Sequence, residues 1–178
     1  MTTQTADAKK IDTRKVISWL PIQSYHHIVD VGCGVGYFTV PFAKHVFLGK
    51  VFATDISQEK LDATGKALKV ANLSNIVLLI SKEKKLPLDD GSVDGVFFSR
   101  ILHHAKDYKA LLKEGMRCVK KTGWIAVIEL HKKQMGSTHP VDELINESDL
   151  RTAAEKQGFR LSNRHDVNNR YYVLVMRK

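Results

Sequence analysis

The sequence predicts an α/β fold with a seven-stranded, mostly parallel sheet, an antiparallel last strand and helices on both faces. The first observation is that strand-like and helix-like segments alternate along most of the chain, which is typical of parallel strands joined by crossover helices. The second is that only residues 166–170 separate the last two strand-like segments. That gap is too short for a crossover helix, so these two strands should pair antiparallel.

Each predicted element follows from local patterning. Apolar residues at helical spacing run over 11–20 and stop before Pro21. Ser57 has the side chain of a helix N-cap, and Gly158 suits a helix end. The predicted helices are 11–20, 37–45, 57–71, 108–119 and 147–157, and the predicted strands are 27–31, 50–54, 75–80, 93–98, 123–130, 159–165 and 171–176.

Length and composition are those of one globular domain. The chain has 178 residues, of which 43% are hydrophobic and 26% charged. We expect a disordered tail over 1–10 and a single domain over 11–178, as a monomer or homodimer. No apolar run approaches the roughly 20 residues of a membrane span. The start of the chain lacks an apolar signal core, and Cys33 and Cys118 have no paired spacing, so we expect a cytoplasmic protein.

The net charge of +9 raises the question of an acidic partner. The lysines and arginines are spread along the chain, and the densest groups, such as Lys82, Lys84 and Lys85, are short. No aromatic residues interleave with them, as stacking on single-stranded nucleic acid would require. A solvated basic surface is therefore favoured over a nucleic-acid interface.

The most informative stretch is a glycine-rich loop between the first predicted strand and the next helix. Gly32, Gly34 and Gly36 have the spacing GxGxG, which differs from the GxGxxG of dinucleotide-binding proteins. Asp55 ends the second predicted strand, 19 residues after Gly36, where a carboxylate can bind both ribose hydroxyls. The alternative is a plain strand-to-helix turn followed by a helix-start acid. Together, the loop and the acid indicate a ligand that contains a nucleoside.

Asp30 helps to distinguish between the possible nucleoside-containing ligands. It lies inside the first predicted strand, directly before the glycine loop. A buried carboxylate needs donors or cations around it, and it would repel the pyrophosphate of a dinucleotide. A ligand with a sulfonium and an ammonium group suits it better, which argues against an NAD-dependent oxidoreductase.

Five stretches, in order, resemble the class I S-adenosylmethionine-dependent methyltransferases. The resemblance is to the methyltransferase type 11 subgroup, which includes the ubiquinone and menaquinone biosynthesis C-methyltransferases. It covers roughly residues 12–130 and implies a Rossmann-like fold with S-adenosylmethionine as cofactor. The stretches are Asp-Val-Gly-Cys-Gly-Val-Gly at 30–36, Thr-Asp-Ile-Ser at 54–57, Leu-Pro-Leu-Asp-Asp-Gly-Ser-Val-Asp at 86–94, Ser-Arg-Ile-Leu-His-His at 99–104 and Glu-Gly-Met-Arg-Cys-Val-Lys-Lys-Thr-Gly-Trp at 114–124.

The resemblance also implies roles for single residues. The glycines would wrap the methionine part of the cofactor, Asp55 would bind the ribose and Ile56 would pack on the adenine. Lys82 and Glu83 replace an Asn/Asp-Ala pair of the family, so the contact with adenine departs from the family pattern. The implied cofactor-binding residues are Asp30, Gly32, Cys33, Gly34, Gly36, Asp55, Ile56, Lys82, Glu83 and Ser99.

Methyl transfer from a sulfonium needs alignment and desolvation, and it needs a base only if the acceptor must lose a proton. His103 and His104 are the candidate bases, and the alternative is that the pair packs after the fourth strand. The histidines are too scattered for a predicted metal site. Residues for the acceptor pocket should lie at the carboxyl ends of strands one, four and five. They are Tyr37, Arg100, His103, His104, Glu129 and His131.

The predicted function is therefore transfer of a methyl group from S-adenosylmethionine to a small-molecule acceptor. Three alternatives stay open: a non-catalytic S-adenosylmethionine-binding module, an RNA methyltransferase and an NAD-dependent oxidoreductase. The segment after the fourth strand, which starts Phe98-Ser-Arg, lacks the Asn/Asp-Pro-Pro-Tyr type of motif that base-amine methyltransferases carry.

Overall fold

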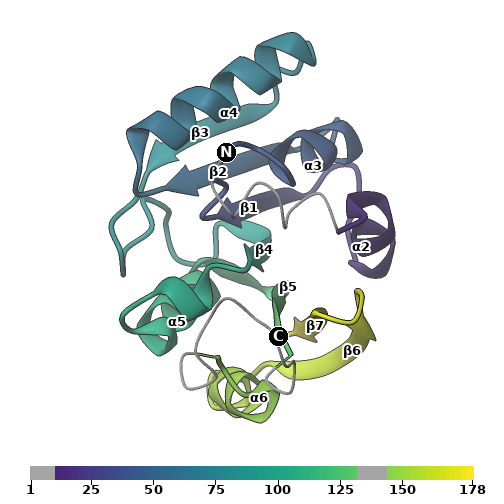
Figure 1. The fold of residues 1–178 in the computed structure, drawn as a ribbon, viewed down its shortest axis with the longest axis vertical. Helices are drawn as coiled ribbons and strands as arrows, with labels where there is room; N and C mark the ends of the chain where they lie inside the picture. Colours follow the sequence, from purple (N-terminus) through teal and green to yellow (C-terminus); the bar gives the residue numbers. More distant parts are fainter. Residues whose placement is uncertain (1–10, 132–143) are drawn as a thin grey trace.

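The computed structural model describes residues 11–131 and 144–178. One seven-stranded sheet runs through it in the order β3-β2-β1-β4-β5-β7-β6 (Figure 1). The expected tail over 1–10 lies outside the described residues. The strands are β1 (His27–Val31), β2 (Lys50–Asp55), β3 (Ile76–Ile80), β4 (Val93–Ser99), β5 (Val119–Leu130), β6 (Arg160–Asp166) and β7 (Tyr171–Arg177).

The pairing of the strands confirms the predicted fold class. β1 pairs in parallel with β2 and β4, β3 extends the sheet beyond β2, and β5 continues it beyond β4. β7 runs antiparallel to both β5 and β6, because the short connection over 167–170 leaves no room for a crossover. The carboxyl ends of β1, β2, β4 and β5 therefore share one edge of the sheet, where α/β folds place their ligand sites.

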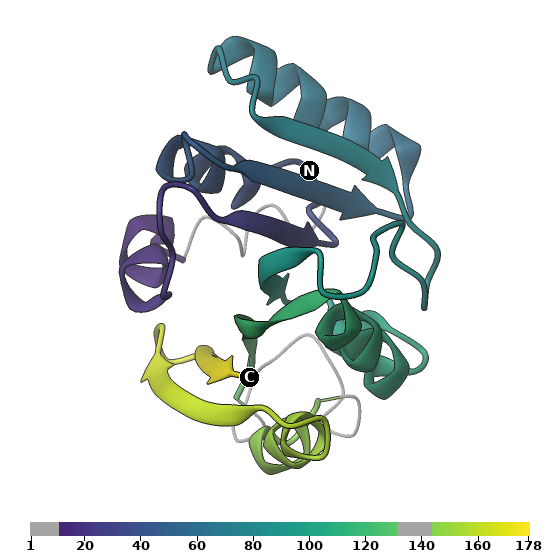
Figure 2. The same cartoon turned by 180° about the vertical axis from the view of Figure 1, so that it is seen from behind.

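Helices cover both faces of this sheet (Figure 2). On one face, Phe42 of the helix Thr39–His45 packs with Phe97 and Trp124, and on the other, Leu112 packs with Phe98 and Tyr172. Phe97 and Phe98 are neighbours in β4 and point to opposite faces, as successive strand residues must. The helices are α2 (Thr13–Trp19), α3 (Thr39–His45), α4 (Gln58–Val70), α5 (Tyr108–Cys118) and α6 (Glu147–Glu155), with a short 3₁₀ helix, η1 (Leu102–His104).

Side-chain caps set the starts of α2, α4 and α5, and at α5 the cap is Asp107, which accepts from the amide of Ala110. Asp12 caps α2 by accepting from the amides of Arg14 and Lys15. Ser57 accepts from the amide of Lys60 at the start of α4, so the predicted N-cap is confirmed. α3 begins at Thr39, two residues later than predicted, because the glycine loop continues as turns before the helix. No helix in the described parts of the chain is long and apolar enough to span a membrane.

Two helix-interior glycines give a matched test of the packing. A methyl group on Gly115 in α5 would lie 2.4 Å from Cζ of the fully buried Phe98. A methyl group on Gly65 in α4 would lie 3.3 Å from Cδ1 of Leu78, a side chain that is 37% exposed and able to shift. We expect Gly115→Ala to lower the free energy of unfolding by about 1–3 kcal/mol through overpacking. Gly65→Ala should raise it by about 0.5–1 kcal/mol through helix propensity.

Urea denaturation of the two variants measures both changes. A gain in stability for Gly115→Ala would show that Phe98 has room to move, against the packing described for this face of the sheet.

Candidate functional site

The glycine loop leaves β1 and turns back under the end of β2. The amides of Gly32 and Cys33 both donate to the Thr54 carbonyl, at 2.8 and 2.9 Å. The φ values of Gly32, Gly34 and Gly36 are +69°, +61° and +86°, which residues other than glycine rarely adopt. A Cβ on Gly34 would meet no atom of the described structure within 4 Å, so the loop backbone there faces open space. A ligand can approach the chain closely at this point.

Asp55 ties this loop to the start of α4. Its buried carboxylate accepts from the Gly34 amide through Oδ2 and from the Ser57 amide through Oδ1, both at 3.0 Å. It therefore joins the loop to Ser57, the residue that itself caps α4. A carboxylate has about four acceptor positions, so two remain for hydroxyl groups of a ligand. Ile56, the next residue, is 65% exposed and offers an apolar surface beside them.

Asp30 is a buried acid on the α3 side of β1. Its Oδ2 accepts from the Thr39 hydroxyl at 2.7 Å. Burial raises the pKa of Asp30 to about 7, and the nearby charge of Asp55 acts in the same direction. A cationic group beside Asp30 would restore its ionised form, as expected for a ligand that carries an ammonium group.

Cys33 lies in the same loop, with its Sγ atom 3.9 Å from the Thr64 hydroxyl oxygen. Burial raises the pKa of this thiol far above its usual range, so it stays neutral at physiological pH. Cys33 is a small packing residue here and has no thiolate to act as a nucleophile.

The loop after β3 holds Lys82 and Glu83, the departures from the family pattern. Lys82 and Lys85 close a tight turn by exchanging backbone hydrogen bonds. Lys82 is exposed, and Glu83 accepts from the Lys106 amide at 3.4 Å. Glu83 is thus turned toward the loop before α5.

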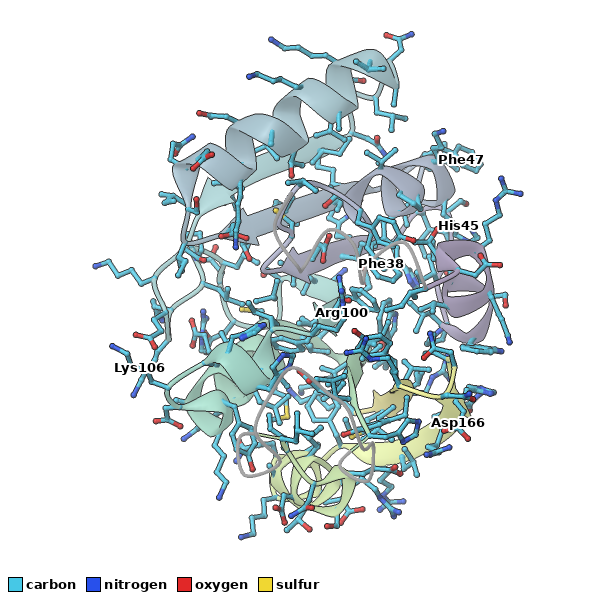
Figure 3. The ribbon with its side chains drawn as sticks, in the orientation of Figure 1. Phe38, His45, Phe47, Arg100, Lys106 and Asp166 are labelled. Carbon is cyan, nitrogen blue, oxygen red and sulfur yellow. The ribbon has the colours of Figure 1, made fainter. Side chains whose placement is uncertain are left out.

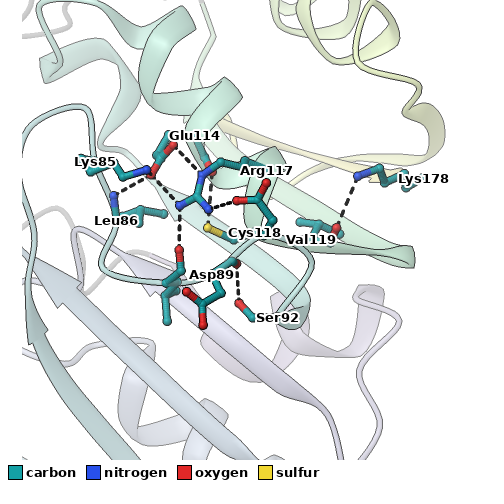
Figure 4. Close-up of polar contacts among 11 residues, drawn as sticks. Lys85, Leu86, Asp89, Ser92, Glu114, Arg117, Cys118, Val119 and Lys178 are labelled. Carbon is teal, nitrogen blue, oxygen red and sulfur yellow. Dashed lines mark hydrogen bonds and ion pairs between the residues drawn. The ribbon is translucent and has the colours of Figure 1, made fainter.

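An ion network fastens this loop to α5 (Figure 4). Arg117 donates to both carboxylate oxygens of Glu114, to the Leu88 carbonyl at 2.7 Å and to Asp90. Glu114 is buried and also accepts from the Leu86 amide at 3.0 Å. These contacts hold residues 86–90 against α5.

The acceptor end of the site begins where β4 ends. A Cβ on Gly32 would lie 2.7 Å from the Ile101 side chain, so residues 99–101 pass directly over the glycine loop. Arg100 has a left-handed φ of +55° and donates its amide to the Ile128 carbonyl at 2.8 Å. Ser99 Oγ and Arg100 Nε are buried with no hydrogen-bond partner among the described residues. Unpartnered polar atoms in such a place point to a ligand.

His103 and Glu129 form a buried pair at the ends of β4 and β5. His103 Nδ1 lies 2.5 Å from Glu129 Oε2, and their side chains are 4% and 2% exposed. The other oxygen of Glu129 accepts from the Leu102 amide at 3.0 Å, which orients the carboxylate. The His104 ring stacks at an angle on His103, with 4.0 Å between ring centroids. Sequence reasoning nominated all three residues and left their pairing unpredicted.

The remaining predicted acceptor residues, Tyr37 and His131, separate in space. The Tyr37 hydroxyl donates to the Ile11 carbonyl at 2.6 Å, on the α2 side of the sheet. His131 turns toward β6, where its Nε2 lies 3.1 Å from Asp166 Oδ1. Tyr171 and Tyr172, which sequence reasoning missed, enter this region because the start of β7 pairs with the end of β5. Among the described residues, no three His, Cys, Asp or Glu side chains are grouped as metal ligands.

The open glycine loop, the acid at the end of β2 and the unpartnered polar atoms at the end of β4 are the candidate features for binding a nucleoside-containing cofactor on this sheet. A family model described as a methyltransferase domain matches residues 29–127. The chain belongs to this family of methyltransferase domains.

Individual relatives agree with the family match. An uncharacterized methyltransferase of Schizosaccharomyces pombe is 34% identical over 114 residues, which are 61% of this chain and 41% of that protein. A demethylmenaquinone methyltransferase of Staphylococcus aureus is 31% identical over 121 residues, 67% of this chain and 49% of that protein. The chain thus spans less than half the length of these relatives.

Solved structures share the fold. A SAM-dependent methyltransferase from Aquifex aeolicus superimposes with a TM-score of 0.85 at 26% identity, over 94% of this chain and 89% of that one. The [4+2]-cyclase SpnF superimposes with a TM-score of 0.82 at 17% identity, over 100% of this chain and 83% of that one, which shows likeness of fold alone.

Arg117→Met tests the ion network that holds the loop over 86–90. It should lower the free energy of unfolding by about 3 kcal/mol, because the buried Glu114 loses its main cation. It should also speed hydrogen exchange at the Leu86 amide, whose acceptor is that carboxylate. Lys113→Met, at an exposed position of the same helix, is the control and should change neither quantity. Unchanged exchange at Leu86 in Arg117→Met would show that the network does not hold this loop.

Proposed function

We propose that this chain binds S-adenosylmethionine at the edge formed by β1, β2 and β4 and transfers its methyl group to a small-molecule acceptor. The observation that carries the proposal is the pairing of the Asp55 carboxylate with the open Gly34 backbone in a chain of the methyltransferase domain family. This arrangement offers a close backbone approach and a charged acceptor for hydroxyl groups within one short stretch of surface.

The residues present fit such a cofactor. Gly32, Gly34 and Gly36 would wrap its methionine part, with the buried carboxylate of Asp30 near its ammonium group. Asp55 would accept from the ribose hydroxyls, as the two free acceptor positions of its carboxylate allow. The exposed side chain of Ile56 would pack on the adenine, and Ser99 Oγ, unpartnered in the described structure, would face the methionine end. Cys33, Lys82 and Glu83 would border the cofactor through backbone atoms.

The cofactor supplies an electrophilic methyl group, so the protein needs no nucleophile of its own. The protein has to align the acceptor with the methyl group, exclude water and, for a protic acceptor, remove one proton. His103 is the better placed base, because Glu129 can hold its Nδ1–H and so fix the tautomer in which Nε2 is the basic atom. His104 packs against that ring as a support.

The acceptor class is the open part of this proposal. The relative in Staphylococcus aureus is named for demethylmenaquinone, so a quinol belongs among the candidates. Phenols, thiols, amines and small acids belong there too, because a histidine base serves several of them. We further propose that 11–178 acts as a single domain and that nucleic acid is not its substrate.

Cofactor binding and turnover are tested separately. S-adenosylhomocysteine at 100 times its dissociation constant should stabilise the protein by about 2.7 kcal/mol, whereas NAD should have no effect. Stabilisation by NAD alone would replace the proposal with an oxidoreductase. A screen of acceptors with labelled S-adenosylmethionine then distinguishes an enzyme from a non-catalytic binding module, which would bind the cofactor and give no labelled product.

Asp55→Asn should weaken the binding of S-adenosylhomocysteine by about 2–3 kcal/mol. The ribose hydroxyls lose a charged acceptor, and the hydrogen bond from the Gly34 amide to this side chain becomes weaker or is lost. Calorimetric titration measures the change. Asp62→Asn, at an exposed position of α4, is the matched control and should leave the affinity unchanged. A folded Asp55→Asn protein with affinity within twofold of wild type would assign Asp55 to the loop structure alone.

Affinity for S-adenosylhomocysteine should rise with pH through the titration of Asp30. Its pKa is raised to about 7 in the free protein, so below pH 7 the neutral acid must lose a proton before it can pair with the ammonium group of the ligand. The dissociation constant should therefore be about eightfold larger at pH 6 than at pH 7.5. Asp30→Asn, which keeps an acceptor for Thr39, should bind more weakly at pH 7.5 and flatten this dependence. An equally steep dependence in Asp30→Asn would assign the effect to another group.

A further inference from the structure

Arg100, one of the candidate acceptor residues directly after β4, is a cation that no described carboxylate pairs with. Its side chain is half-buried, and its Nε atom is buried without a hydrogen-bond partner in the described structure. No carboxylate within the described ranges forms an ion pair with it. A guanidinium offers five donors, and a buried Nε–H that no described group accepts is a desolvated donor with an unfavourable free energy. Arg100 lies near the centre of the molecule in Figure 3, far from the rim residues Lys106 and Asp166.

Two aromatic side chains, Tyr171 and Tyr37, lie near Arg100. Its guanidinium carbon lies 5.8 Å from the centre of the Tyr171 ring, and so does that of Arg170. Burial raises the pKa of the Tyr37 phenol, and the positive charge of Arg100 acts against that shift, which places the two side chains near each other. The acid that also acts on Tyr37 is Asp12, whose carboxylate already caps α2. Within the described ranges, Arg100 thus has aromatic neighbours and no ion pair.

The backbone holds Arg100 in this place at an energetic cost. A φ of +55° is unfavourable for a residue that has a Cβ atom, by of order 1 kcal/mol or more. The strained conformation is retained by the hydrogen bond to the Ile128 carbonyl and by the neighbouring Ile101, which packs on Gly32. Ile101 contacts the glycine loop, which is the proposed binding place for the methionine end of the cofactor, and Arg100 directly precedes Ile101 in the chain.

We propose that Arg100 is the specificity determinant of the acceptor site and that it binds an anionic group, a carboxylate or a phosphate, on the molecule that receives the methyl group. A planar guanidinium pairs with either group through two parallel hydrogen bonds, which fixes the orientation of the acceptor as well as its position. The acceptor class is thus a small acid that reaches Arg100 with its charged end and the cofactor with its nucleophilic atom. This inference rests on the proposed methyltransferase function.

The rival source of an anion is the carboxylate of the cofactor itself, and the test keeps the two apart. Protein saturated with S-adenosylhomocysteine is titrated with benzoate, phenyl phosphate and the neutral benzamide. We expect benzoate or phenyl phosphate to bind at least tenfold more tightly than benzamide, and the preferred anion shows whether carboxylate or phosphate fits. Arg100→Met should abolish this preference, whereas Arg100→Lys should keep part of it, since a lysine retains the charge without the planar fork.

Arg160→Met is the matched control, because Arg160 is an exposed arginine at the start of β6. It should change neither the preference for anions nor the affinity for S-adenosylhomocysteine. The affinity of Arg100→Met for S-adenosylhomocysteine, in protein that melts like the wild type, should stay within twofold of the wild-type value. Should Arg100→Met not fold, Arg100→Lys alone decides, through a reduced anion preference at unchanged cofactor affinity.

Three results would overturn the inference. Equal binding of benzamide and the two anions by wild-type protein would remove the anion site and leave the methyltransferase function standing. A tenfold loss of S-adenosylhomocysteine affinity in Arg100→Met would assign Arg100 to the carboxylate of the cofactor. Failure of the wild-type protein to bind S-adenosylhomocysteine at all would overturn the proposed function, and this inference with it.

Discussion

The structure of the site depends on one buried carboxylate. Asp55 accepts from the amides of Gly34 and Ser57, and so joins the loop after β1 to the helix after β2. Hydrogen bonds from backbone amides to a charged acceptor are stronger than neutral ones, which suits a loop whose three glycines would otherwise have many conformations. Once the loop is held, Gly34 keeps an open backbone, Ile56 is exposed next to Asp55 in the sequence, and two acceptor positions of Asp55 remain. The feature that shapes the loop is thus also the feature proposed to recognise the ribose.

Charged side chains recur around the site, and they differ in how far other protein groups compensate their charge. Arg117 and Glu114 compensate each other and hold the loop after β3, a purely structural task. Asp30 has a single hydroxyl partner and a pKa raised to about 7, so a cationic ligand would complete its surroundings. Arg100 has an aromatic neighbour and no described counter-ion, so an anionic ligand would complete it. Asp30 and Arg100 thus each lack a partner of opposite charge among the described residues. A zwitterionic cofactor beside an acidic acceptor would supply both partners.

The alternation of strand residues divides the acceptor end into two halves. Glu129 and Tyr172 face the side covered by α5 and α6, whereas the next pair along, Leu130 and Tyr171, faces the side of α2 and α3. The His103–Glu129 pair therefore lies on one side of the sheet edge, and Arg100 beside Tyr171 lies on the other. An acceptor placed over the edge could meet the proposed base at one end and the proposed anion site at the other, with the methyl group between them.

By itself, the sequence determined the alternation of strands and helices, the reversed last strand, the Ser57 cap and the glycine loop with its acid, because these depend on contacts between residues close along the chain or on connection length. It also nominated Arg100, His103 and Glu129 through their places after strands four and five. Only the tertiary structure decided which of these meet: His103 pairs with Glu129, His131 turns to Asp166, and Tyr171 joins Arg100. Strand order and the pleat of neighbouring strands set those contacts, and residues tens of positions apart carry no local signal of their pairing.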